Sequence, residues 1–120
     1  MIMDNKELGK EGERMAAEYL QGKGYRIIQR NYIKRSGEID IISFDTDNSE
    51  YVFVEVKTRR NKSFGDPEDS VDDYKLEKIT ETAENWLSDN DIDDMDWRID
   101  IISIEWDNGR YNIRHLENIS

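Results

Sequence analysis

The sequence predicts an α/β fold in which a mixed central sheet is flanked by helices, in the order α-β-β-β-α-β-β. Two stretches carry apolar residues at the spacing of an amphipathic helix. Five shorter stretches are rich in β-branched and aromatic residues, and turn-forming residues separate them. A chain of 120 residues is long enough for one core, so we expect a single domain over residues 1–120.

Each predicted helix has one apolar stripe. The first helix should run from about Asn5 to Gln21, where Gly22 and Gly24 end it. The second should run from about Val71 to Ser88. The two stripes consist of Leu8, Met15, Ala16, Tyr19 and Leu20, and of Leu76, Ile79, Ala83, Trp86 and Leu87.

Turn signals separate the predicted strands. Ser36-Gly37, the polar segment Asp45 to Glu50 and Asp107-Asn108-Gly109 each suit a hairpin, and a loop is expected from Arg59 to Ser70. The acidic stretch Asp89 to Asp96 should be a solvated connection. The strands are expected over Tyr25 to Ile33, Glu38 to Phe44, Tyr51 to Thr58, Trp97 to Trp106, and Tyr111 to Leu116.

The net charge of −11 is unevenly distributed along the chain. Residues 1–62 hold 12 Lys and Arg against 11 Asp and Glu, whereas residues 63–120 hold 5 against 17. Phosphate binding requires cations, so the total charge argues against nucleic acid. Two clusters without acids are either ordinary solvated faces or basic rims of a binding site: Lys23, Arg26, Arg30, Lys34 and Arg35, and Lys57, Arg59, Arg60 and Lys62.

Some classes of protein and site are excluded by composition. The chain has no cysteine, so it can form no disulfide, thiolate metal site or thiol nucleophile. We expect a cytoplasmic protein, because no apolar segment resembles a signal peptide or approaches the roughly 20 residues that span a bilayer.

The hairpin formed by the second and third strands should bring acids together. If its register is symmetric about the loop centre between Asp47 and Asn48, Asp40 lies opposite Glu55 and Glu38 lies opposite Lys57. Residues two apart on a strand share a face, so all four would project from the same side. Directly opposed Cβ atoms are roughly 4.5–5.5 Å apart.

Two carboxylates at that distance repel each other, and burial among the apolar residues of IDII and VFVEV increases the cost. Such a pair would be stabilised by a cation, and Mg²⁺ or Mn²⁺ held by Asp40, Glu55 and the Val56 carbonyl would supply it. A metal there would activate a water for phosphodiester hydrolysis, with Lys57 assisting. Alternatively, Glu38 and Lys57 form a cross-strand ion pair, and Asp40 and Glu55 face solvent at a sheet edge.

Glu13 is the acid of the first helix that lies nearest to its apolar stripe, because at 100° per residue it falls close to Leu20 and Ala16. It could join the carboxylates of the hairpin, or it could be a partly exposed residue at the border of the buried face.

These residues stand in segments that resemble a known family: GKEGERMAAEYLQGKGY (9–25), RNYIKRSGEIDII (30–42), VFVEVKTR (52–59), FGDPEDSV (64–71) and RIDIISI (98–104). The chain looks like the YraN-like family of small bacterial proteins, which is similar to archaeal Holliday-junction resolvases. The likeness covers nearly the whole chain, and GEID followed by EVK at this separation is fairly specific.

The resemblance implies a restriction-endonuclease-like fold. It also implies that Glu13 is the helical glutamate of the site, that Asp40 and Glu55 bind the metal, and that Lys57 is the motif lysine. Glu38 belongs to the GEID signature, and Lys75 matches a basic position that could contact phosphate.

We therefore expect an endonuclease acting on structured or branched DNA with Mg²⁺ or Mn²⁺. An enzyme of this type would dimerise to cut two strands symmetrically. The alternative is a non-catalytic module that keeps the fold and binds nucleic acid or protein. The expected nucleic-acid contacts are Arg30, Lys34, Arg35, Arg59, Arg60 and Lys75.

Other residues are interpreted as structural. His115 is the only histidine and no neighbouring residue makes it a general base. Asp100 repeats the IDII pattern of Asp40, which is attributed to two strands with similar burial. Trp86, Trp97 and Trp106 lie at helix and strand spacing, which favours core packing over base stacking.

Overall fold

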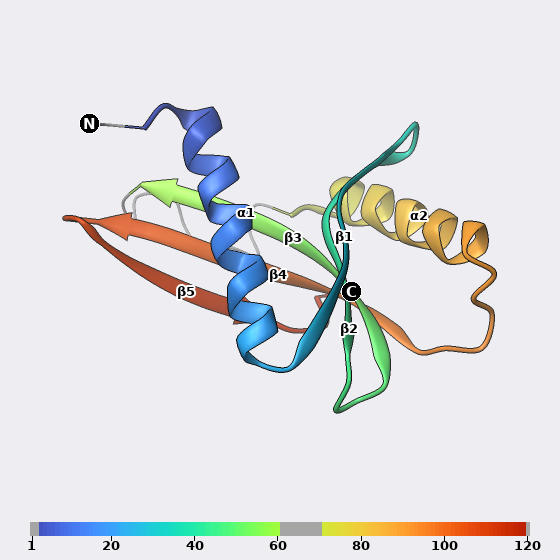
Figure 1. Ribbon diagram of the computed structural model, residues 1–120. Coiled ribbons are helices and arrows are strands. Elements are labelled where there is room, and N and C mark those ends of the chain that lie inside the picture. The colour runs from blue at the N-terminus through green and yellow to red at the C-terminus, as the bar shows by residue number, and fades with distance from the viewer. Residues whose placement is uncertain (1–2, 61–70, 120) are drawn as a thin grey trace.

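The computed structural model describes residues 3–60 and 71–119 (Figure 1). The predicted order α-β-β-β-α-β-β and the mixed central sheet are confirmed. The elements are α1 (Asn5–Gly22), β1 (Tyr25–Lys34), β2 (Gly37–Asp45), β3 (Glu50–Arg60), α2 (Asp73–Asp89), β4 (Trp97–Asp107) and β5 (Arg110–Leu116).

The strands lie in the sheet in their order along the chain, β1-β2-β3-β4-β5. Three of the neighbouring pairs are antiparallel hairpins, and β3 with β4 is parallel. Parallel neighbours need a long crossover connection, and α2 belongs to the one between β3 and β4. The sheet is therefore mixed because one helix interrupts a series of hairpins.

The two helices pack on separate hydrophobic cores. Alternating strand residues supply both cores: Ile41 and Val54 belong to the core beneath α1, and Ile42 and Phe53 to the core beneath α2. Figure 1 shows α1 crossing the strands at an angle, with α2 beside the β1–β2 hairpin. In the described ranges no helix is long and apolar enough to cross a membrane.

Aspartate side chains set the starts of both helices. Asp4 accepts a hydrogen bond from the Glu7 N–H at 2.8 Å, and Asp72 accepts one from the Lys75 N–H at 2.8 Å. The expected start of the second helix at Val71 was therefore two residues early, because Asp72 is its cap.

Strand β3 continues past its expected end at Thr58. Its parallel pairing with β4 extends to Arg60, which lies opposite Trp106. The loop expected from Arg59 to Ser70 is therefore wrong at Arg59 and Arg60, and its remaining residues, 61–70, lie outside the described part of the chain.

The β1–β2 hairpin contains one bulge and one residue in a left-handed backbone conformation. Its register shifts between Ile27 and Gln29, which marks a β-bulge. Asn31 has a φ of 54°, a left-handed conformation that asparagine tolerates better than most residues. The pairs Arg30–Ile41 and Tyr32–Ile39 keep one register, so Asp40 of β2 faces Asn31 of β1.

Candidate active site

Strands β2 and β3 stop pairing at Asp40. The predicted hairpin register is confirmed over five pairs, from Asp45 with Glu50 to Ile41 with Val54. Beyond Ile41 the Asp40 carboxylate accepts a hydrogen bond from the Val56 N–H, at 2.8 Å. The expected direct pairing of Asp40 with Glu55 is thus replaced by a side-chain bond, because a carboxylate oxygen takes the place of a strand carbonyl.

The separation of the strands opens the sheet at this point. Figure 1 shows the β1–β2 hairpin extending toward α2, while the ends of β3 and β4 extend to the opposite side of the view. The Val56 N–H points toward β2, and the N–H and C=O of one strand residue point to the same side. The Val56 carbonyl therefore also faces the Asp40 side of β3, as a metal ligand from this residue would require.

Two lysines contact one oxygen of Glu55. Lys57 Nζ lies 3.4 Å from Glu55 Oε1, and Lys75 Nζ lies 3.0 Å from the same atom. Lys57 is on β3 with Glu55, whereas Lys75 comes from the first turn of α2. Glu55 is 8% exposed, so this contact is largely removed from water.

The alternative arrangement predicted from the sequence is wrong for these residues. Within the part of the chain that the structure describes, Lys57 forms its ion pair with Glu55, and Glu38 is exposed. Glu55 is buried and Asp40 is partly buried, so neither is a solvated residue at a sheet edge.

Glu13 reaches the site from α1. The helix approaches β3 closely at Gly12, where an added Cβ would lie only 1.9 Å from the Thr58 hydroxyl oxygen. Glu13 Oε1 is buried and has no hydrogen-bond partner in the described part of the chain. An orphaned buried carboxylate oxygen is costly unless a ligand satisfies it.

Burial and mutual repulsion raise the pKa values of two acids of the site. Burial, together with the nearby Glu55 carboxylate, raises the pKa of Asp40 to about 7. Burial also raises the pKa of Glu13, and Glu38 and Glu55 add to that effect. Burial and the adjacent Lys75 lower the pKa of Lys57.

The residues present fit a hard divalent cation. Asp40, Glu55 and the Val56 carbonyl are oxygen donors of the type that Mg²⁺ and Mn²⁺ prefer. The raised pKa of Asp40 and the orphaned oxygen of Glu13 indicate that the acids would be stabilised by more positive charge than the two lysines supply. We call Glu13, Asp40, Glu55, Lys57 and Lys75 the Asp40 site.

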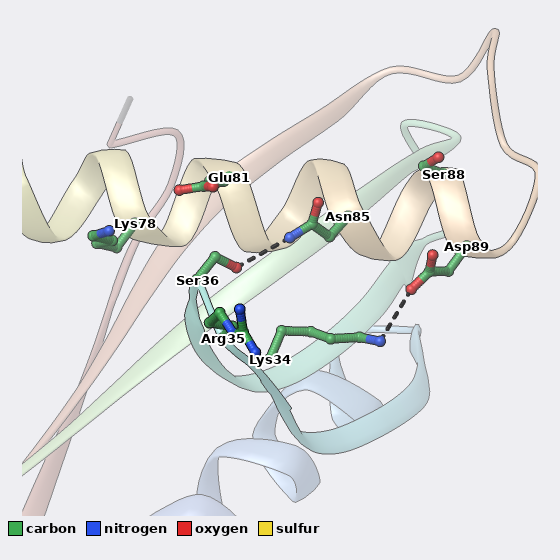
Figure 2. A pocket seen from close by; sticks show the side chains of 8 residues that line it. All are labelled: Lys34, Arg35, Ser36, Lys78, Glu81, Asn85, Ser88 and Asp89. Carbon is green, nitrogen blue, oxygen red and sulfur yellow. Dashed lines mark hydrogen bonds and ion pairs between the residues drawn. The ribbon is translucent and has the colours of Figure 1, made fainter.

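Three of the cations predicted to contact nucleic acid line two cavities beside β1. Arg30 lines a cavity of about 500 Å³ with Lys10, Glu13 and Asn31. Because Glu13 lines it, this cavity lies next to the Asp40 site. A second cavity, of about 540 Å³, separates the β1–β2 turn from α2 (Figure 2). It is lined by Lys34, Arg35, Ser36, Lys78, Glu81, Asn85, Ser88 and Asp89.

Figure 2 shows a hydrogen bond and an ion pair between the walls of this second cavity. Asn85 donates to the Ser36 hydroxyl at 3.1 Å, and Lys34 pairs with Asp89 at 3.3 Å. Arg35 and Lys78 complete a lining in which three cations face two carboxylates. The excess of positive charge suits an anion.

The other predicted cations have partners within the protein. Arg59 pairs with Glu105 on β4 at 3.6 Å. Arg60 donates to the Met3 carbonyl and to the Asn5 side chain, and so joins β3 to the start of α1. Lys75 belongs to the centre of the Asp40 site rather than to its rim.

A second group of buried charges surrounds Arg98 on β4. Its guanidinium contacts the carboxylates of Asp45, Glu50, Asp100 and Glu117 and the Tyr25 hydroxyl. Asp100 is fully buried and also accepts hydrogen bonds from the Asn118 N–H and from His115. We call these residues, with His115, the Arg98 network.

Part of the Arg98 network could hold a metal ion. One ligand atom from each of Asp100, His115 and Glu117 lies within 4.8 Å of the others. However, both oxygens of Asp100 already accept hydrogen bonds from Arg98, at 3.0 and 3.2 Å. A metal would have to displace the guanidinium that neutralises this group.

Sequence reasoning assigned Asp100 and His115 structural roles but missed that they share one network with Arg98. A signal was present, because Arg98 and Asp100 are two apart on a strand that is otherwise apolar. Charged residues on the same face of a central strand require partners.

Residues 12–104 match the model of the uncharacterised protein family UPF0102. The chain belongs to the UPF0102 family. This confirms the YraN-like resemblance predicted from the GEID and EVK segments.

Relatives in UPF0102 extend over nearly the whole chain. A UPF0102 protein of Persephonella marina is 46% identical over 92% of this chain and 90% of its own. One from Alkaliphilus oremlandii is 43% identical over 95% and 97%, and one from Pelobacter propionicus is 41% identical over 96% and 83%.

Among solved structures, the UPF0102 chain is similar to Pyrococcus furiosus SfsA in complex with Ca²⁺. The TM-score is 0.37 at 14% sequence identity, over 98% of this chain and 65% of the other.

Proposed function

We propose that this chain is a Mg²⁺- or Mn²⁺-dependent endonuclease that hydrolyses phosphodiester bonds of structured or branched DNA. The main support is the pair of carboxylates Asp40 and Glu55, which occupy the point where β2 and β3 separate. Burial, with the Glu55 carboxylate beside it, raises the pKa of Asp40 to about 7, and a bound cation would stabilise its charged form.

Asp40, Glu55 and the Val56 carbonyl would hold the metal. When bound, the metal supplies a Lewis acid that polarises a phosphoryl oxygen and promotes ionisation of water. The buried Glu13 oxygen, which has no partner among the described residues, faces the same acids and would order water beside them.

Lys57 is the side chain suited to orient or activate the attacking water. Its pKa is lowered by burial and by Lys75, so it can release or accept a proton more readily than an exposed lysine. Held 3.4 Å from Glu55, its ammonium can also stabilise negative charge that develops on the phosphate.

The two cavities beside β1 would carry the nucleic acid. Arg30 lines the cavity next to Glu13, and Lys34, Arg35 and Lys78 line the cavity next to α2. A strand that follows β1 would meet cations in both cavities, which is the charge that phosphate requires. A homodimer would place two such sites on the two strands of a branched substrate.

The test is cleavage of labelled DNA. Branched, duplex and single-stranded substrates are incubated with Mn²⁺, with Mg²⁺ and with EDTA, beside a Glu55→Gln control of verified fold. We expect cleavage that requires the metal and falls by about 10²- to 10³-fold in the control. If no substrate is cut faster by the wild type than by Glu55→Gln, the chain is not a nuclease of this kind.

A second candidate is a non-catalytic module that binds nucleic acid or protein. It is favoured by the 17 Asp and Glu in residues 63–120, which give part of the surface the wrong sign for DNA. This hypothesis predicts that cells carrying Asp40→Asn behave like the wild type when the variant folds normally. Loss of function in those cells would support the enzyme.

A further inference from the structure

Lys75 contacts one carboxylate oxygen of Glu55, which we propose as a metal ligand. Its Nζ lies 3.0 Å from Glu55 Oε1, closer than the Nζ of Lys57 at 3.4 Å. A lysine ammonium and a divalent cation that bind the same carboxylate repel each other. A bound metal would therefore change the position of Lys75.

The position of Lys75 is unfavourable for the helix itself. It is the third residue after the cap Asp72, whose side chain accepts its N–H. The N-terminus of a helix carries partial positive charge, so a lysine in the first turn is disfavoured there. A residue that breaks a local rule needs a compensating interaction, and Glu55 provides it.

Lys75 is freer to move than Lys57. Its side chain is 37% exposed, against 25% for Lys57, and it comes from the end of a helix rather than from within a strand. Its four-carbon stem allows the ammonium to turn toward solvent without moving α2.

We propose that Lys75 is an exchangeable counter-ion of the Asp40 site. It holds Glu55 while the metal is absent and releases that carboxylate when the metal binds, which frees its ammonium for a phosphate of the substrate. This inference rests on the proposed metal-dependent function and adds a positioning residue to it.

The test compares Mn²⁺ affinity in the wild type, Lys75→Gln and Lys78→Gln, measured from the electron paramagnetic resonance signal of free Mn²⁺. Lys78 is the matched control, because it is on the same helix and its ammonium lies over the Tyr74 ring, 5.5 Å from the centroid. We expect Lys75→Gln to bind Mn²⁺ at least about fivefold more tightly and Lys78→Gln to bind like the wild type.

Thermal unfolding of the metal-free proteins separates this role from a structural one. Lys75→Gln should be less stable without metal and yet bind Mn²⁺ more tightly. Lower stability with unchanged or weaker affinity would make Lys75 a structural ion-pair partner and overturn the proposal.

A measurement on the wild type keeps the test independent of how the variants fold. In protein labelled at lysine Cε, the NMR resonance of Lys75 should shift as Mg²⁺ is added and saturate with the binding curve, while Lys78 stays in place. Saturable metal binding without that shift overturns only the proposal that Lys75 is an exchangeable counter-ion. No saturable binding overturns both the counter-ion and the metal-dependent function.

Discussion

The Asp40 site and the Arg98 network both bury carboxylates on one sheet, but they differ in the cations that contact those carboxylates. In the Arg98 network one guanidinium contacts four carboxylates, and it lies within the protein. In the Asp40 site two lysines contact Glu55, whereas Asp40 is hydrogen-bonded only to a backbone N–H in the contacts described.

The pKa values follow this difference. Burial acts to raise the pKa of Asp100, but hydrogen bonds from His115 and Arg98 hold it below its usual range. Burial and Glu55 raise the pKa of Asp40 instead. Removing the cation of a buried carboxylate is costly, whereas a buried carboxylate without a cation is a candidate ligand for one.

The largest expected effect is on the Arg98 network. Arg98→Met would leave Asp45 and Asp100 buried without their cation, which should lower the free energy of unfolding by about 3–5 kcal/mol. Urea denaturation measures it. The control is Arg110→Met at an exposed position, where we expect a change within about 0.5 kcal/mol. A loss below about 1 kcal/mol at Arg98 would mean that the network does not stabilise the fold.

The next effect tests which group binds metal. Mn²⁺ at about 100 times its dissociation constant should stabilise the wild type by about 2.7 kcal/mol. Asp40→Asn should abolish this gain, because a ligand is lost. The gain should persist in His115→Gln, which alters the Arg98 network. The opposite result would assign the metal to Asp100, His115 and Glu117.

A smaller effect concerns pH. The folded-state pKa of Asp40 lies above its unfolded value, so the folded state binds more protons. The contribution of this group to stability therefore decreases as the pH rises from about 4 to about 7. Asp40→Asn lacks this term. The free energy of unfolding of the metal-free variant should therefore increase relative to that of the wild type over this pH range, by at least about 1 kcal/mol at pH 8.

Asp100 should show the opposite trend. Its pKa is depressed, so its contribution is present above its ordinary pKa and is lost as the pH falls below that. Denaturant titrations at several pH values check both residues. A stability difference between Asp40→Asn and the wild type that does not vary with pH would contradict the charge imbalance at the Asp40 site.

The smallest effect concerns the cavity beside α2. Arg35→Gln should weaken DNA binding a few-fold and reduce the salt slope by about one, because one phosphate contact is lost. Fluorescence anisotropy at several salt concentrations measures both. Arg26→Gln, at the other end of β1, is the control and should bind DNA like the wild type. Equal losses in both variants would indicate non-specific attraction.

Much of the fold could be predicted because local signals agree with tertiary packing. Apolar periodicity and turn residues placed all the elements to within about two residues, and the hairpin register brought Asp40 near Glu55. The helical spacing of Glu13 pointed it toward the same acids. Contacts between distant elements could not be predicted, because no periodicity encodes them.

The two IDII segments show where sequence information ends. By itself the sequence determined that both are buried central strands, since period and composition decide burial. Only the tertiary structure decided that Asp100 lies beside Arg98 and His115, whereas Asp40 lies where two strands separate and Lys75 reaches Glu55 from α2. The reason is physical: the charge state of a buried carboxylate depends on which cations the fold brings near it. The same neighbours in the sequence do not determine which cations those are.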